Sequence, residues 1–485
     1  MNAIDAWQLE NTYADLPKKF YTGIKPTPVN APKLIIFNKK LANALGIDLA
    51  DDDNKILAEL FSGNKLPNKV NPIAQAYAGH QFGHFSILGD GRAHLLGEQI
   101  APNGQRFDIQ FKGSGQTPYS RNGDGRAALG PMLREYIISE AMHALNIPTT
   151  RSLAVVSTGE SIMRSSLLQG AILTRVAASH IRVGTFEYAN KMLTHKDLKT
   201  LADYAIARHY PELSSEENPY LSFLRAVIAK QAQLVASWMH VGFIHGVMNT
   251  DNMTVSGETI DYGPCAFMDI FSIGRTFSSI DHHGRYSYGS QAHAAHWNLI
   301  KLAESLLPLL HKNANAATKL AEDAIDGYAN AFNSAWISGM RAKLGLFGEE
   351  DADFTLVQNL LQWMETSKAD FTSTFRDFTY DNLSENENYH SLTFKKWHSL
   401  WQARLLRNAK PIELALDLMR KFNPVVVPYN HYVEEALAAA EKGDMNSFTS
   451  LLAALETPFS LTSTNEDYRR FPINSISNYQ TFCGT

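Results

Sequence analysis

One short segment of this 485-residue chain carries side chains whose types and spacing suit metal and phosphate chemistry. The segment runs from His245 to Asn252 and is soon followed by Asp261-Tyr262-Gly263. A metal ion that bridges triphosphate oxygens prefers hard oxygen ligands, such as an amide carbonyl and a carboxylate. Asn252 and Asp261 supply one of each, so we expect a site for a nucleoside triphosphate and a divalent metal. The alternative is an ordinary turn, because Asn and Asp also favour turns.

The spacing within the segment matches the catalytic loop of protein kinases, with histidine first and a metal-binding asparagine last. Asp261-Tyr262-Gly263 then stands where a kinase has Asp-Phe-Gly. The match fails at the third position, where a kinase places its catalytic base and this chain has Val247. Because valine cannot accept a proton, Asp251 is the better candidate for the base. Its alternative role is to shape the turn by hydrogen bonds to backbone amides.

A second group of residues lies upstream and has the types expected around a triphosphate. Leu88–Arg92 contains Gly89 and Gly91 between two predicted strands, where backbone N–H groups can approach phosphates, although a simple hairpin turn is the alternative. Lys112 ends a strand of alternating apolar residues, and we expect it to pair with Glu135 on the next predicted helix, as in kinases. Glu140 is a second possible partner, and a solvated surface lysine is the alternative interpretation.

Two further segments offer polar groups to the same site. The segment 113–126 is long, polar and rich in glycine, and long loops in compact domains tend to be functional. We therefore expect Asp124 and Gly125 to line the nucleotide site. Arg175 and Arg182 are seven residues apart, and if this stretch is helical both guanidinium groups lie on one face, suited to a phosphate chain. Two solvated arginines are the alternative.

The elements that must position these residues follow from hydrophobic periodicity and turn residues. Helical spacing over 218–241 leads directly into the loop, and a strand–turn–strand hairpin over 253–260 is expected to return Asp261 beside Asn252. After an irregular leader, further strands and helices are predicted from the same patterns. The predicted strands are 86–89, 93–100, 107–112 and 152–157, and the predicted helices are 41–60, 130–145 and most of the chain from about 291.

This order of elements predicts an α+β fold with a strand-rich lobe, a helical lobe and a helical C-terminal extension. The expected divisions are residues 1–70, 71–160, 161–320 and 321–485. Composition is that of a globular protein, with 45% hydrophobic and 19% charged residues. The net charge of −5 gives no field that attracts nucleic acid or an anionic membrane.

The sequence shows no signal for a location other than the cytoplasm, and it shows no metal site built from histidine. No apolar run is long enough to span a membrane, and the first twenty residues lack the apolar core of a signal peptide. We therefore expect a cytoplasmic protein without a membrane partner. His80 and His84 are four residues apart, but they lack a zincin glutamate and stand among glycines, so we expect a turn or core role for both.

Four motifs of this chain together resemble the selenoprotein O family, and the resemblance covers nearly the whole length. It implies a protein-kinase-like bilobal fold with N-terminal and helical C-terminal extensions. It also implies a pseudokinase that transfers AMP, or UMP, from ATP or UTP to hydroxyl groups of protein substrates, with Mg²⁺ or Mn²⁺ as the metal. The nucleotide would lie flipped relative to kinases, so that its α-phosphate faces the acceptor. The motifs are Tyr77–His84, Leu88–Arg92, Gln110–Arg121 and His245–Asn252.

The resemblance also assigns roles to residues already selected by charge and spacing. It makes Asp251 the proton acceptor, Asn252 and Asp261 the metal ligands, and Glu135 the residue that positions Lys112. The nucleotide-binding residues that it implies are Gly89, Gly91, Arg92, Lys112, Asp124, Gly125, Arg175, Arg182 and Asp261.

The two cysteines of the chain suggest one further expectation. Members of the family often end with cysteine or selenocysteine three residues from the terminus, as Cys483 does here. Cys265 lies just past Asp-Tyr-Gly, so we expect a Cys265–Cys483 disulfide that clamps the tail over the loop and acts in regulation. Two unrelated thiols are the alternative.

The expected assembly is a monomer whose partners are its protein substrates, without a nucleic-acid partner. Two other functions remain open. The first is a kinase that transfers the γ-phosphate with an unusual base. The second is a catalytically silent nucleotide-binding scaffold, for which Val247 is the best support.

Overall fold

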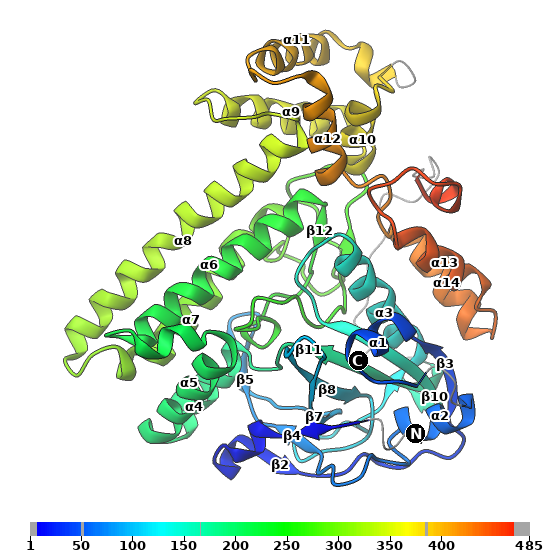
Figure 1. Cartoon of the computed structure of the whole chain (residues 1–485), viewed down its shortest axis with the longest axis vertical. Coiled ribbons are helices and arrows are strands. Elements are labelled where there is room, and N and C mark those ends of the chain that lie inside the picture. Colours follow the sequence, from blue (N-terminus) through cyan, green and yellow to red (C-terminus); the bar gives the residue numbers. More distant parts are fainter. Residues whose placement is uncertain (1–6, 50–52, 165, 384–386, 470–485) are drawn as a thin grey trace.

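The computed structural model describes residues 7–49, 53–164, 166–383 and 387–469. Strands lie in the first part of the chain and long helices in the second, so the fold mixes α and β structure (Figure 1). The strands are β1 (Leu9–Glu10), β2 (Tyr21–Gly23), β3 (Lys33–Phe37), β4 (Ile73–Gln75), β5 (Ala78–Gln81), β6 (His84–Ile87), β7 (Ala93–Ile100), β8 (Arg106–Lys112), β9 (Ala127–Ala128), β10 (Arg151–Met163), β11 (Leu167–Ala177), β12 (Phe243–Ile244) and β13 (Ala266–Phe267). The α-helices are α1 (Lys39–Ala44), α2 (Asn54–Phe61), α3 (Leu129–Ala144), α4 (Val183–Met192), α5 (His195–His209), α6 (Pro219–His240), α7 (Gln291–Leu310), α8 (Ala314–Lys343), α9 (Asp353–Ser367), α10 (Phe371–Tyr380), α11 (Leu392–Leu406), α12 (Ile412–Phe422), α13 (Asn430–Glu441) and α14 (Asn446–Leu455).

The largest sheet is antiparallel and holds Lys112 at the end of a central strand. Its order is β2-β4-β7-β8-β11-β10-β3, with β1 paired to β7 and β9 paired to β11. Lys112 of β8 faces Ala93 on β7 and Leu173 on β11, so neighbours on both sides fix its backbone. The last five residues of β8 are buried, which places the lysine against the interior rather than in solvent.

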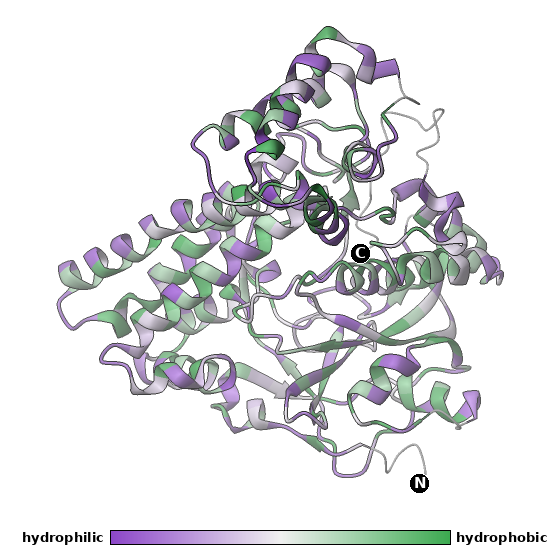
Figure 2. Ribbon diagram, turned by 45° about the horizontal axis from the view of Figure 1, so that its top comes forward, coloured by the Kyte–Doolittle hydropathy of each residue, from purple (hydrophilic) through white to green (hydrophobic). Residues whose placement is uncertain are grey.

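Helix α3 packs against β10 and β11, while α6, α7 and α8 pack on one another in a separate group (Figure 1). These long helices carry both hydrophobic and hydrophilic residues along their length, as expected of helices that bury one face (Figure 2). Helices α9 to α12 form a further group at the end of α8, around an aromatic core that includes Phe378, Trp397 and Trp401.

The C-terminal helices return to the sheet and support α3 (Figure 1). Arg134 of α3 is buried, and it donates a 3.1 Å hydrogen bond to Asn430 Oδ1 on α13. It also forms an ion pair with Glu434 on the same helix. The helix that carries Glu135 therefore rests on residues almost 300 positions later in the chain.

Most predicted elements are confirmed, with boundaries shifted by a few residues. The predicted strands correspond to β6, β7, β8 and β10, and the predicted helices at 130–145 and 218–241 correspond to α3 and α6. The predicted α+β composition is therefore borne out at the level of mixed sheet and helix. The division into four segments stays a prediction.

Three local predictions were wrong. The helix expected at 41–60 is two helices. The first, α1, ends before Gly46, because the φ of 72° at Gly46 is left-handed and cannot be part of a right-handed helix. The first seventy residues are not only an irregular leader, since they add β1, β2 and β3 to the sheet. The segment 253–260 is not a hairpin paired with itself. Instead, Thr254 bridges to Arg182 and Thr259 bridges to Thr149.

Within the part of the chain that the structure describes, no helix combines the length and the apolar character that crossing a membrane requires.

Candidate active site

The loop that follows α6 is held at both ends by neighbouring strands and by a buried histidine. Strand β12 precedes the loop and pairs with β13, which follows Asp-Tyr-Gly, so the two ends lie together. His245 is buried, and its Nε2 lies 2.9 Å from the carbonyl oxygen of Ile260. Asn252 Nδ2 consequently lies 3.3 Å from Asp261 Oδ2, which confirms the predicted proximity without the predicted hairpin.

Asp261 is the point at which three cationic side chains meet. Its Oδ1 accepts hydrogen bonds from Lys112 Nζ at 2.9 Å and from an Arg175 guanidinium nitrogen at 2.6 Å. Its Oδ2 accepts a 2.7 Å bond from Arg182. Burial alone would raise the pKa of this carboxyl, but the charges of Lys112, Arg182 and Arg175 outweigh burial and hold the pKa well below its usual range. Asp261 therefore stays ionised.

Glu135 is the second carboxylate of this cluster, and its predicted pairing with Lys112 is confirmed. Lys112 Nζ lies 2.6 Å from Glu135 Oε2, and Arg175 lies 3.2 Å from Glu135 Oε1. Glu140, the other possible partner of the lysine, instead accepts hydrogen bonds from Arg151 at 2.6 and 2.8 Å. The cluster thus joins the central strand, helix α3 and the loop.

The two arginines reach the cluster from two different elements. Arg175 lies on strand β11 and Arg182 just before helix α4, so the predicted shared helical face is wrong. A buried strand reads as a continuous apolar run, which periodicity alone cannot distinguish from a buried helix. Both arginines nevertheless lie at one site, as expected, because both contact Asp261.

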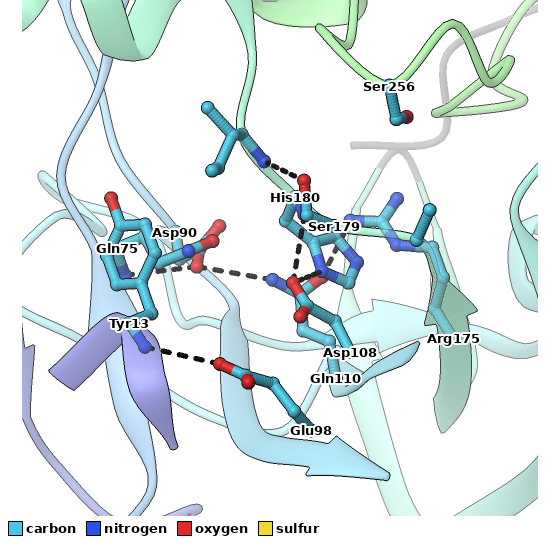
Figure 3. Close-up of polar contacts among 12 residues, drawn as sticks. Tyr13, Gln75, Asp90, Glu98, Asp108, Gln110, Arg175, Ser179, His180 and Ser256 are labelled. Carbon is cyan, nitrogen blue, oxygen red and sulfur yellow. Dashed lines mark hydrogen bonds and ion pairs between the residues drawn. The ribbon is translucent and has the colours of Figure 1, made fainter. Parts of the chain in front are cut away.

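Gln110 and Tyr77 also belong to the site, although no sequence pattern singled out either residue by itself. An Arg175 nitrogen donates to Gln110 Oε1 at 2.6 Å, and Gln110 Nε2 donates to Asp90 Oδ2 at 3.2 Å (Figure 3). The Arg182 guanidinium lies 4.7 Å from the centre of the Tyr77 ring. Gln110 lies two residues before Lys112 on one strand, hence on the same face, and this spacing was an available signal.

The glycines of Leu88–Arg92 make room for a second loop. A Cβ atom on Gly89 would overlap the ring of Tyr119, and one on Gly91 would lie 2.9 Å from the Tyr119 carbonyl oxygen. The hydroxyl groups of Thr117 and Ser120 donate to the carbonyl oxygens of Asp90 and Gly91. The segment 113–126 is therefore fastened directly onto the turn between β6 and β7, and the Arg92 carbonyl also accepts from Gly113.

Asp124 and Gly125 hold the other edge of the same segment. The Asp124 carboxylate accepts two hydrogen bonds from Arg164, at 2.8 and 2.9 Å, and a third from the Arg126 backbone. The hydrogen bonds from Arg164 hold the pKa of Asp124 below its usual value. Gly125 has a φ of 69° and packs against the backbone of Gly115. These contacts order the segment, whereas a direct role toward a nucleotide stays a prediction.

Asp251 has the surroundings expected of a proton acceptor. Its side chain is nearly buried, and its Oδ1 has no hydrogen-bond partner among the described residues. Its backbone carbonyl accepts a 2.8 Å bond from Arg182, which ties it to the cationic cluster. Burial raises the pKa of the Asp251 carboxyl to about 6, against the opposing charge of Arg182. A base with a pKa near the working pH is well matched to general-base catalysis.

Asn252 and Asp261 fit a metal ion only together with ligands from a nucleotide. Among the described residues, no group of three or more His, Cys, Asp or Glu side chains could hold a metal on its own. An amide and one carboxylate are two hard oxygen donors, and Mg²⁺ sites commonly combine one or two carboxylates with substrate phosphates. The donor set therefore fits a nucleotide-bound Mg²⁺ or Mn²⁺.

Cys265 is fully buried, close to Tyr262. Cys483, its predicted disulfide partner, lies outside the described residues. The disulfide stays a prediction.

A nearly buried carboxylate with a raised pKa thus lies beside a cationic cluster and two hard oxygen donors, a combination that is typical of enzyme sites. Residues 4–456 match the family model described as protein adenylyltransferase SelO, so the chain belongs to this family. It is 56% identical over 480 residues to the protein nucleotidyltransferase YdiU of Brevibacillus brevis, covering 99% of this chain and 98% of the relative. It is 57% identical over 481 residues to the protein of the same name from Bacillus mycoides, with the same coverage. The predicted resemblance is confirmed, and the chain is a nucleotidyltransferase.

Proposed function

We propose that this nucleotidyltransferase transfers AMP from ATP to Ser, Thr or Tyr hydroxyl groups of other proteins and releases pyrophosphate. The observation that carries the proposal is the place of Asp251, a nearly buried carboxylate with an unpartnered oxygen, beside the cationic cluster and next to Asn252 in the chain. Family membership supports the adenylyl group as the group transferred. The missing kinase base at Val247 argues against ordinary transfer of the γ-phosphate.

In the proposed reaction, Asp251 takes the proton of the acceptor hydroxyl, and the hydroxyl oxygen attacks the α-phosphorus. The bond from that phosphorus to the bridging oxygen breaks, and pyrophosphate leaves with the electron pair. Lys112, Arg175 and Arg182 stabilise the negative charge that develops on the phosphoryl oxygens. A Mg²⁺ or Mn²⁺ ion held by Asn252 and Asp261 would supply Lewis-acid polarisation of those oxygens when bound.

The charges of the cluster support a triphosphate as the ligand. Lys112, Arg175 and Arg182 meet the carboxylates of Glu135 and Asp261 there, so three cations are gathered at one place where a phosphate chain could bind. Lys112, Arg175 and Arg182 are nearly or fully buried, and a charge pair 4 Å apart gains about 4 kcal/mol at an effective dielectric constant of 20, against about 1 kcal/mol in water. A phosphate chain would therefore be held strongly.

We further propose a protein-kinase-like bilobal arrangement, with the sheet and α3 in one lobe and the loop in the other. The pairing of a strand lysine with a helix glutamate supports it. The nucleotide would lie with its α-phosphate toward Asp251, and the phosphate contacts would serve UTP and UMP transfer equally. A cytoplasmic monomer acting on protein substrates completes the proposal. The proposed nucleotide-binding residues are Gly89, Gly91, Arg92, Lys112, Asp124, Gly125, Arg175, Arg182 and Asp261.

The test uses ATP labelled at either the α- or the γ-phosphate, with labelled protein separated from free nucleotide. Retention of the α-label alone supports AMP transfer. Retention of the γ-label alone refutes it and restores a kinase, and nucleotide binding without retention of either label identifies a scaffold. Intact-mass analysis after incubation with ATP or UTP then identifies the group added.

A pair of variants tests the role of Asp251. Asp251→Ala should abolish transfer and leave the Kd for ATP largely unchanged, because the cationic cluster remains. Asp203→Ala removes an aspartate from the exposed surface, where it pairs with Lys199, and should transfer AMP at the wild-type rate. Full activity of Asp251→Ala would exclude Asp251 as the base.

A further inference from the structure

The β5–β6 hairpin packs directly against Asp251. Gly79 of β5 lies directly against the carboxylate. A Cβ atom at this position would overlap Asp251 Oδ1 and would lie 2.8 Å from both Asp251 Cγ and Leu88 Cδ1. The φ of Gly79 is not in the left-handed region, so any residue could adopt its backbone conformation. Gly79 is therefore required for space beside the carboxylate.

The same hairpin is bonded to the two residues that precede Asp251. The backbone N–H of His80 donates to the Thr250 hydroxyl at 2.7 Å, and the backbone N–H of Phe82 donates to Asn249 Oδ1 at 3.0 Å. Thr250 is completely buried and Asn249 nearly so. The hairpin therefore uses side chains of the loop as partners for its own backbone, and its position and that of the loop are coupled.

Helix α4 completes the enclosure with a buried acid that the proposed reaction does not use. Glu187 lies against His80 Nδ1, and Thr250 is close enough to lower the pKa of its carboxyl, in opposition to burial. Burial raises the pKa of Glu187 to about 7 and lowers the pKa of His80 to about 4. On the same helix, a Cβ atom at Gly184 would lie 3.5 Å from Asp251 Cα. An apolar pair would fill this space without the desolvation cost of a buried acid, so the polar pair indicates a positional role.

We propose that Gly79, Thr250 and Glu187 are positioning residues that fix the Asp251 carboxylate for removal of the acceptor proton. This inference rests on the proposed function, since it assigns the residues to the base of that reaction. The three act through Asp251, whereas the phosphate-binding cations contact Asp261. Changes in the positioning residues should therefore lower kcat and leave nucleotide binding in place.

The first test is Gly79→Ala, which places a methyl group where the carboxylate now lies. A displacement of about 1 Å at a reacting group can cost about 100-fold, so we expect kcat to fall by roughly 10- to 100-fold. The KM for ATP should change by less than about twofold, because the substitution leaves the residues proposed to bind ATP unchanged. Gly23→Ala is the matched control, since Gly23 also lies in a strand and has no atom within 4 Å of an added Cβ.

The second test removes the Thr250 hydroxyl without changing the shape of the side chain. Thr250→Val leaves the His80 N–H without its acceptor and should lower kcat roughly tenfold, while Thr250→Ser should restore most of it. Thr150→Val is the control, because Thr150 is equally buried and its hydroxyl has no partner among the described residues. If Gly79→Ala does not fold, the Thr250 pair decides alone.

Failure of the proposed AMP transfer can be distinguished from failure of the positioning inference, because label transfer by the wild type is measured in the same series as kcat of the variants. Wild-type AMP transfer together with wild-type kcat in folded Gly79→Ala and Thr250→Val proteins would overturn the positioning inference and leave the proposed function standing. Retention of γ-label by the wild type, with kcat still lost in both variants, would overturn AMP transfer and support the positioning role. A fall in kcat and a rise in KM by equal factors would also overturn the inference.

Discussion

Removing Glu135 should lower the free energy of unfolding, and the size of the loss can be worked out from the contacts of its carboxylate. The carboxylate is buried and accepts charged hydrogen bonds from Lys112 at 2.6 Å and Arg175 at 3.2 Å. Each such bond contributes about 1.5–3 kcal/mol, and breaking a buried ion pair costs about 3–5 kcal/mol. Both cations keep Asp261 as a partner, which places the expected loss for Glu135→Ala near the lower limit, at about 3 kcal/mol.

The assay is equilibrium urea unfolding of the two variants Glu135→Ala and Glu304→Ala, followed by tryptophan fluorescence. Glu304 also pairs with a lysine, Lys301, but its side chain is 52% exposed, so its removal should cost less than about 0.5 kcal/mol. A loss below about 1 kcal/mol for Glu135→Ala would refute the reasoning, because it would mean that solvent screens the cluster. A loss equal to that of the control would refute the claim that burial sets the magnitude.

Three further predictions concern activity. Because burial raises the pKa of Asp251 to about 6, this base is protonated at lower pH, and a pH–rate profile should show AMP transfer rising through about pH 6 and levelling above it. A profile that is flat from pH 5 to 8 would contradict this. Chelation with EDTA should abolish transfer, and added Mg²⁺ or Mn²⁺ should restore it in the same label assay; transfer that persists in EDTA would contradict the metal site. Asp124→Ala releases Arg164 and loosens the segment 113–126, so calorimetry should show ATP affinity reduced by less than about tenfold. An unchanged ATP affinity would contradict the proposed role of Asp124 in nucleotide binding.

Residues of the site could be predicted where a chemical requirement coincides with a local spacing. The interval between His245 and Asn252, followed by Asp261, predicted that the two side chains meet, and the structure places Asn252 Nδ2 3.3 Å from Asp261 Oδ2. The pairing of Lys112 with Glu135 was expected from the analogy with the strand lysine and helix glutamate of kinases, and the structure selects Glu135 over Glu140.

Other features depend on chain segments that meet only in three dimensions. The turn at Gly89 and Gly91 carries glycines because Tyr119, from another loop, packs against it. No local sequence pattern predicts this contact. A helix around Arg175 could only be considered as one possibility, because a strand buried on both faces lacks the alternation that identifies a half-buried strand. The segment 253–260 has hairpin-like turns, yet its backbone bonds go to Thr149 and Arg182 instead.

The support that α13 gives to α3 has a consequence for synthesis on the ribosome. Arg134, next to Glu135, is bonded to Asn430, which lies 296 residues later. At about 5–20 residues per second, the ribosome delivers that partner roughly 15 to 60 s after the helix itself has been made. During this interval the nascent chain already has Lys112 and Glu135, and later Asp261, without the helix that braces them. Synthesis of α13 would then set the earliest time at which α3 can gain this support.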